Sequence, residues 1–366
     1  MTDRISDPAA QAAALVAGAY ASAAAQGALP GGISLSPRAE AARDASRGDW
    51  ASPFALAAAG AMGMRPREIA GILLEHLDLS GSVFASAEVA GGGFLNFRLG
   101  DGWYAAVLAR AESGDLLGDR RSALAGRRVL VETAAGGAPP LADLRARLTG
   151  GALAGLMEAQ GAAVCRSAGD GGPFHRTVLV LVPGSPPPQT PPGAEVLAVG
   201  PVRLSGGGPA LEAAVSMDAL RWVLTAGPNR PAELDTDLMI REDWANPLYR
   251  TEYACRRCRA LTAALAAEGT PVPPAKDVDT ALLGDTERAL LRRLAQLPDQ
   301  VDLAVRDLDP GRISRWLTAL GEDFYRFYAA CPLRCGDAAV TAVRLKLLDA
   351  AGAGLETGLR LLGIGT

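Results

Sequence analysis

One stretch constrains the architecture more than any other: Asn246-Pro247-Leu248-Tyr249-Arg250-Thr251-Glu252-Tyr253-Ala254. Asparagine is favoured just before a helix, and proline suits the first helical position, where its missing N–H needs no partner. No further proline interrupts the chain before the Gly- and Pro-rich segment 269–274, so we expect one long helix over 247–268. Further helices are expected over 280–296, 298–307, 310–330 and 335–362. From about Asp218 onward the chain is therefore expected to be all-helical.

The composition is that of a globular protein. The chain has 366 residues, of which 49% are hydrophobic and 21% charged, and its mean hydropathy is +0.14. No apolar run approaches the roughly 18 residues that would span a membrane. The first fifteen residues lack a basic segment and a cleavage site, and the five cysteines are an odd number. We therefore expect a cytoplasmic location and no membrane partner.

The charged residues narrow the range of functions. A net charge of −4 argues against general coating of nucleic acid, and we expect no DNA partner. Nearly all the basic residues are arginines, which can read phosphate and stack on bases, so a local RNA-binding face is still compatible. The chain has only two histidines, His76 and His175, and two lysines, Lys276 and Lys346. Chemistry that needs adjacent histidines, or a lysine in a central loop, is excluded.

The first part of the chain is expected to mix helices and strands. An alanine-rich helix over 8–27 precedes a helical hairpin, 50–62 and 66–77, in which His76 lies on the apolar stripe as a structural residue. Strands are expected over 83–89 and 94–99, and a helix over 102–113. The second strand alternates, with Phe94, Asn96 and Arg98 on one face.

The middle part has the pattern of one parallel α/β unit. A strand over 128–132 precedes a helix over 141–160, and short strands follow over 163–166, 177–182 and 195–199. A Pro-rich loop, 183–193, separates the last two. About thirty residues between Gly172 and Arg203 allow roughly one such unit, too few for a nucleotide fold wound on both sides.

The ordered set of motifs resembles arginyl-tRNA synthetases. In the first part of the chain these are Gly48-Asp49-Trp50-Ala51, Arg65-Pro66-Arg67-Glu68-Ile69-Ala70 and Val89-Ala90-Gly91-Gly92-Gly93-Phe94-Leu95-Asn96-Phe97. The later ones are 144–161, Gly169-Asp170-Gly171-Gly172, 218–221, 234–237, the 246–254 stretch, Phe324-Tyr325-Arg326-Phe327-Tyr328 and 358–364.

The resemblance implies an α+β protein whose C-terminal half is mostly α. It implies a small α+β domain over 1–118 that binds the tRNA elbow and a reduced α/β domain over 119–235, a Rossmann-like remnant of a class I synthetase. It also implies a DALR-type anticodon-binding helical bundle over 236–366.

The resemblance also indicates which catalytic groups are missing. Class I synthetases hold the phosphates of ATP with a His-x-Gly-His turn, and the matching positions are Pro140-Leu141-Ala142-Asp143. Catalytic donors must point where charge develops, and neither Pro140 nor Asp143 provides one. The Lys-Met-Ser-like loop corresponds to Arg203-Leu204-Ser205, with Arg203 and Ser205 but no lysine. We therefore expect no catalytic residues, no cofactor and no enzyme activity.

The family places RNA contacts at two sites. Phe94 and Asn96 match an aromatic and an amide that touch a flipped D-loop base, and the alternative is that Phe94 belongs to the core. Tyr249, Arg250 and Tyr253 match residues against anticodon bases, and the alternative is that the tyrosines pack between helices. Arg257 follows on the same helix. Basic and acidic residues nearly balance over 236–366, so its arginines form either a binding face or a mixed solvated surface.

Cysteines at Cys255, Cys258, Cys331 and Cys335 could in principle supply four zinc thiolates. Their spacing within helices does not suit a zinc knuckle, so we expect packing roles and no metal.

These observations favour a catalytically inactive, tRNA-binding paralogue that serves as an adaptor or regulator. Its partners would be a tRNA, of the arginine type by resemblance, and a tRNA-modifying or other protein. One alternative is a ligase-like protein that still binds ATP or arginine. The other is a protein-interaction scaffold that has lost RNA binding.

Overall fold

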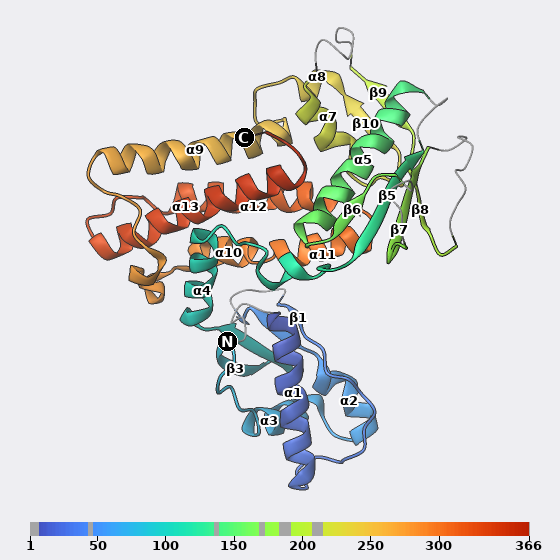
Figure 1. Ribbon diagram of the computed structural model, residues 1–366. Helices are drawn as coiled ribbons and strands as arrows, with labels where there is room; N and C mark the ends of the chain where they lie inside the picture. Colours follow the sequence, from blue (N-terminus) through green and yellow to red (C-terminus); the bar gives the residue numbers. More distant parts are fainter. Residues whose placement is uncertain are drawn as a thin grey trace. The chain divides into compact units, whose positions relative to one another are not determined.

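The computed structural model describes residues 7–42, 47–134, 139–167, 173–182, 192–206 and 215–365. The chain divides into two compact units, Met1–Val107 and Leu108–Thr366 (Figure 1). The mixed α+β architecture with a helical C-terminal region is confirmed. The domain boundaries expected at 118/119 and 235/236 stay predictions.

The first unit is a four-stranded antiparallel sheet with helices against one face. Its strands are β1 (Glu40–Ala41), β2 (Trp50–Ser52), β3 (Phe84–Ala90) and β4 (Phe94–Leu99), in the order β1-β2-β4-β3. Its helices are α1 (Pro8–Ala25), α2 (Phe54–Met62), α3 (Pro66–Glu75) and the start of α4 (Asp101–Glu112). Leu95, Phe97 and Leu99 are buried, which leaves Phe94, Asn96 and Arg98 on the opposite face, as the alternation predicts.

One element of this unit was predicted wrongly. The expected helix 50–62 begins only at Phe54, because Trp50–Ser52 forms strand β2. Trp50 pairs with Phe97 and Ser52 with Leu95 in the ladder to β4. A strand of three residues has no local sequence period, so its partner decides its conformation.

The second unit contains the predicted parallel unit. The strands β5 (Arg128–Ala134), β6 (Ala163–Cys165), β7 (Arg176–Leu181) and β8 (Glu195–Ala198) pair in the order β6-β5-β7-β8, all parallel. Helix α5 (Pro140–Ala159) packs on β5 and β7 and also contacts the helical bundle.

A second parallel pair corrects the expectation that the chain is all-helical after Asp218. After α7 (Met217–Leu224), strand β10 (Ala232–Asp235) pairs with β9 (Val202–Ser205), and α8 (Thr236–Met239) follows. Ala232 and Leu234 are buried whereas Glu233 is exposed, the period of two that marks a strand. The segment is too short for that period to stand out among helices.

Arg145 joins α5 to the two loops around this pair. Its guanidinium is fully buried and donates six hydrogen bonds to backbone carbonyl oxygens. The acceptors, at 2.7–3.2 Å, belong to Gly200, Pro201, Leu224, Ala226, Gly227 and Arg230.

The rest of the second unit is a helical bundle. Its helices are α9 (Pro247–Ala267), α10 (Asp285–Leu294), α11 (Leu297–Arg306), α12 (Gly311–Ala330) and α13 (Ala338–Leu361), and α9 packs along α13 and α12 (Figure 1). The helix expected over 280–296 starts late, because Thr280–Leu282 forms a 3-10 turn first. The one expected over 335–362 starts at Ala338, capped by the Asp337 carboxylate.

The two lysines differ in their exposure to solvent. Lys346 on α13 is 2% exposed, and its ammonium donates to Glu112 at 2.7 Å and Asp349 at 3.3 Å. Lys276, in a short 3-10 turn, is exposed.

No helix in the described part of the chain is both long and apolar enough to cross a membrane.

Candidate functional site

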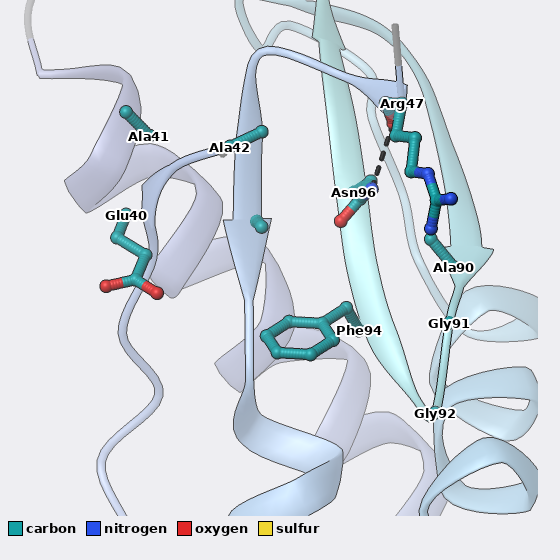
Figure 2. Close-up of a pocket in the computed structure, with 10 residues that line it drawn as sticks. Glu40, Ala41, Ala42, Arg47, Ala90, Gly91, Gly92, Phe94 and Asn96 are labelled. Carbon is teal, nitrogen blue, oxygen red and sulfur yellow. Dashed lines mark hydrogen bonds between the residues drawn. The ribbon is translucent and has the colours of Figure 1, made fainter. Parts of the chain in front are cut away.

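A cavity of about 340 Å³ lies on the open face of the first unit's sheet (Figure 2). Phe94 and Asn96 from β4 line it, together with Glu40, Arg47 and the turn at Gly91 and Gly92. Phe94 is half-buried rather than part of the core, because the helices cover the other face of the strand. The structure therefore brings Phe94 and Asn96 into one pocket of a size that suits a nucleobase.

The amide of Asn96 has a fixed orientation in this pocket. Asn96 is 6% exposed, and its Nδ2 donates to the carbonyl of Arg47 at 2.9 Å. Figure 2 shows its oxygen pointing away from Arg47. Because the nitrogen already has a partner, Asn96 offers Oδ1 as an acceptor to a ligand with an N–H donor.

The glycine turn before β4 permits a close backbone approach. Gly93 has φ +132°, and a Cβ at this position would lie 2.8 Å from the Cβ of Pro66 on α3. Only glycine fits both the backbone angle and this distance. The turn thereby fixes where β4 starts and where Phe94 lies.

The start of α9 carries the second predicted group of residues. Asn246 caps the helix, with Oδ1 accepting from the N–H groups of Leu248 and Tyr249 at 3.0 and 3.3 Å. The rings of Tyr249 and Tyr253 lie 6.1 Å apart, and Tyr253 is 36% exposed. Arg250 is half-buried. The tyrosines thus lie together at the surface of the bundle.

Two tyrosines from α12 extend this group. The hydroxyl of Tyr325 donates to the carbonyl of Arg250 at 2.9 Å, and burial raises the pKa of Tyr325. Arg257 lies 5.5 Å from the ring centroid of Tyr328 and donates to its hydroxyl at 2.7 Å. The guanidinium of Arg257 is therefore held against Tyr328.

Sequence reasoning missed Trp244. Its ring centroid lies 4.9 Å from that of Tyr325 and 5.8 Å from that of Tyr253. A tryptophan in the polar segment Arg241-Glu242-Asp243-Trp244-Ala245 is an available signal, because such a position offers no amphipathic stripe to bury it. We call Trp244, Tyr249, Tyr253 and Tyr325 the aromatic cluster.

Most other arginines of the bundle are paired with acids. Arg259 bonds Glu356 at 2.9 Å, and Arg326 bonds Asp323 at 2.6 Å. Similar pairs involve Arg256, Arg306, Arg312, Arg315 and Arg334. For these residues the structure shows the mixed, ion-paired surface, so the aromatic cluster rather than a basic face distinguishes this region.

The positions that match the synthetase signatures are not among the residues that line the cavity on the first unit's sheet. Pro140 is the first residue of α5, and Asp143 lies in the first turn, where a carboxylate stabilises the helix dipole. Arg203 is exposed on β9, and the carbonyl of Ser205 accepts from the Thr236 hydroxyl at 3.3 Å. The predicted Gly169–Gly172 motif, the loop 183–191, and Gly207 and Gly208 lie outside the described residues.

The cysteines do not form a metal site within the described ranges. Cys255 and Cys258 are buried one turn apart on α9, and burial raises the pKa of both thiols. Cys331 is buried and Cys335 exposed. Cys255 and Cys258 are each 1% exposed, as side chains packed between helices are; their expected packing role stays a prediction.

Two regions of the chain match known domain families. Residues 251–366 match the DALR anticodon binding domain, and residues 14–99 match the arginyl tRNA synthetase N terminal domain. Fold and matches together define a protein with an anticodon-binding-type bundle and a synthetase-type amino-terminal domain.

Individual relatives agree with these matches. The arginine–tRNA ligase of Symbiobacterium thermophilum is 33% identical over 152 residues, which are 41% of this chain and 27% of that protein. That of Carboxydothermus hydrogenoformans is 32% identical over 153 residues, again 41% and 27%. The aligned segment thus spans about a quarter of the length of these curated relatives.

Solved structures show the same fold. The Thermus thermophilus arginyl-tRNA synthetase aligns with a TM-score of 0.69 at 14% identity, covering 98% of this chain and 99% of that chain. The Plasmodium falciparum arginyl-tRNA synthetase aligns with a TM-score of 0.70 at 10% identity, covering 97% and 98%. With the domain matches, these findings identify the chain as an arginyl-tRNA synthetase-like protein.

Proposed function

We propose that this protein binds tRNA, of the arginine type, without charging it, and acts in the cytoplasm as a tRNA adaptor or regulator. The observation that carries the proposal is the aromatic cluster, which gathers around the start of α9. Tyr253 and Tyr325 lie inside the region 251–366 that matches an anticodon-binding domain, and Trp244 and Tyr249 lie just before it. Proteins read unpaired RNA bases by stacking them on such rings. Most of the neighbouring arginines are already paired, which favours base stacking over phosphate contacts as the source of selectivity.

The pocket of the first unit supports a second contact with the tRNA. Phe94 offers a ring, and Asn96 offers an acceptor whose direction is set by Arg47. This combination suits a base that is flipped out of a loop, with an N–H group directed at Asn96 Oδ1. Because this unit matches the synthetase N terminal domain, we assign this contact to the tRNA elbow.

The residues that replace the catalytic signatures support the proposal that the protein does not aminoacylate tRNA. Pro140 has no N–H to donate, and Asp143 would repel a triphosphate. The loss of one electrostatic donor typically costs about 10² to 10³ in rate, and here several are replaced together. We therefore place this reduced class I catalytic domain among pseudoenzymes.

The first experiment measures arginine-dependent exchange between ATP and pyrophosphate, with and without tRNA. We expect no exchange above that of a blank without protein. Robust exchange would contradict the inactive assignment and favour a protein that still uses ATP and arginine.

The second experiment measures the affinity for an arginine tRNA. Stacking is worth about 1–3 kcal/mol per base, so Phe94→Ala and Tyr253→Ala should each weaken binding by about tenfold. Leu282→Ala, which removes a 40% exposed side chain outside the aromatic cluster, is the control and should bind like the wild type. If the wild type prefers tRNA no more than a random RNA of equal length, the scaffold alternative replaces this proposal.

A further inference from the structure

Trp244 is exposed in a way that packing does not explain. Its side chain is 57% exposed, whereas Trp103, Trp222 and Trp316 are 5%, 6% and 3% exposed. Tryptophan is highly buried on average, and an exposed group of aromatic rings such as Trp244 with Tyr253 marks a candidate interaction site. The indole N–H of Trp244, a hydrogen-bond donor, has no partner among the described residues.

Hydrogen bonds hold the turn that carries Trp244. The carboxylate of Asp243 accepts from the N–H of Ala245 at 2.8 Å and from the guanidinium of Arg241 at 2.8 Å. Asn246 donates from Nδ2 to the carbonyls of Met239 and Arg241 at 3.1 and 3.0 Å. These bonds hold the backbone on both sides of Trp244, which lowers the conformational entropy that is lost when a ligand binds to the ring.

The ring is also buttressed by its neighbours. Its plane stands at 87° to the ring of Tyr325 and at 74° to the ring of Tyr253. Near-perpendicular contacts of this kind place an edge against a face. Together with the high exposure, they leave aromatic surface open for a flat partner.

The surroundings favour a base over an apolar side chain as that partner. A protein hot spot usually inserts into a pocket, but the cavity bordered by Tyr325, Pro247 and Arg250 has a volume of only about 20 Å³, room for a single water. A nucleobase needs only a flat aromatic surface. Trp244 also adjoins Tyr253, which we already assign to base stacking.

We propose that Trp244 is a stacking platform for an unpaired nucleobase of the anticodon loop, next to the base held at Tyr253. This inference rests on the proposed function and adds a contact to it. The contact is sequence-tolerant, because every base has a flat face.

The test uses the full chain and an RNA hairpin with the sequence of an arginine-tRNA anticodon arm. Trp244→Ala should weaken hairpin binding by about tenfold, and Trp244→Phe, which keeps a ring, should retain most of the affinity. Hairpins with one abasic loop position at a time extend the test. At one position the wild type and Trp244→Ala should bind equally, since the base that the ring holds is gone.

Fluorescence gives a readout that a merely structural role would not move. Three of the five tryptophans are buried and Trp50 is half-buried, so quenching by the bound hairpin should come mainly from Trp244 and disappear in Trp244→Phe. Unchanged quenching in that variant, or wild-type affinity in Trp244→Ala, overturns the inference.

The measurements distinguish an error in the proposed tRNA binding from an error in the proposed Trp244 contact. If Tyr253→Ala weakens binding and Trp244→Ala does not, tRNA binding stands and the Trp244 contact is wrong. If the wild-type protein binds neither the hairpin nor the tRNA, both are wrong, and Trp244 then belongs to a protein-docking surface.

Discussion

Replacing Arg145 by methionine should destabilise the second unit, although the change removes a buried charge. Burial lowers the pKa of the Arg145 guanidinium, yet arginine stays protonated at neutral pH, so the charge is present and desolvated. In some proteins an apolar substitute for a buried ion is neutral or stabilising. The six carbonyl acceptors decide the sign here, because they remain when the arginine is gone.

The magnitude follows from those carbonyls. An unsatisfied buried acceptor costs about 1–3 kcal/mol. The carbonyls of Gly227 and Pro201 keep a second partner each, the N–H groups of Arg230 and Ala232, both at 2.9 Å. We therefore expect a loss of about 3 kcal/mol for Arg145→Met. Arg145→Lys, with three donors for six acceptors, should lose less.

Hydrogen exchange localises the effect. The N–H of Gly200 donates to the Pro228 carbonyl at 2.7 Å, and that of Ala232 donates to the Pro201 carbonyl at 2.9 Å, in the loops that Arg145 joins. A loss of about 3 kcal/mol should speed exchange at these amides by about a hundredfold. The control is Arg147→Met, an exposed arginine on the same helix.

Two results would refute this reasoning. One is unchanged exchange at Gly200 and Ala232 in Arg145→Met. The other is a methionine variant that unfolds at a higher urea concentration than the wild type, which would mean that desolvation of the charge outweighs its hydrogen bonds.

Three further predictions concern single side chains. Asn246→Ala should lower the free energy of unfolding by about 1–2 kcal/mol because it removes the cap of α9. Asn246→Asp keeps the capping acceptor but loses the Nδ2 donor to the carbonyls of Met239 and Arg241, so it should recover only part of that loss. A thermal melt of Asn246→Ala that matches the wild type would show that the cap contributes nothing. Burial raises the pKa of Glu252, so ionising this group costs the folded state free energy at neutral pH. Glu252→Gln should then be slightly more stable than the wild type at neutral pH, and urea titrations should show the difference shrinking as the pH falls through the raised pKa of Glu252 and disappearing by about pH 4.5; a difference that grows in acid would reverse the sign. Gly93→Ala should destabilise the first unit by more than about 1 kcal/mol through its backbone angle and its approach to Pro66, whereas Gly92→Ala, with no close neighbour but a methyl of Leu56 at 3.9 Å, should melt like the wild type.

Helices and strands were predicted correctly where the pattern that identifies them lies within the segment itself. The Asn246-Pro247 pair predicted the start of α9, and the alternation in Phe94–Leu99 predicted both the strand and its two faces. The parallel unit around α5 was likewise predicted from its order of strand, helix and strand. These features depend on residues within a few positions of one another.

Non-local partners determine what was missed. β2 is a strand because Trp50 and Ser52 meet Phe97 and Leu95, more than forty residues away in the chain. Strand β10 exists because it pairs with β9. No pattern within so short a segment distinguishes it from a loop or a helix end.

The candidate site shows the same division. Phe94, Asn96, Tyr249 and Tyr253 were nominated by resemblance, and their binding roles stay predictions. The orientation of Asn96 depends on a carbonyl 49 residues earlier in the chain, at Arg47. The position of Trp244 depends on Tyr325, which arrives from α12. Neither relation can be read from the sequence.

The buried position of Lys346 has a practical consequence for experiments on this protein. Amine-reactive dyes and cross-linkers need an accessible, unprotonated amine, and the ammonium of Lys346 is enclosed and bonded to Glu112 and Asp349. The chain has one other lysine, Lys276, and it is exposed. A succinimide ester should therefore react with a single lysine of the native bundle, Lys276, besides the α-amino group of the chain. This allows a fluorophore to be attached to the bundle at a known side chain without any engineered cysteine.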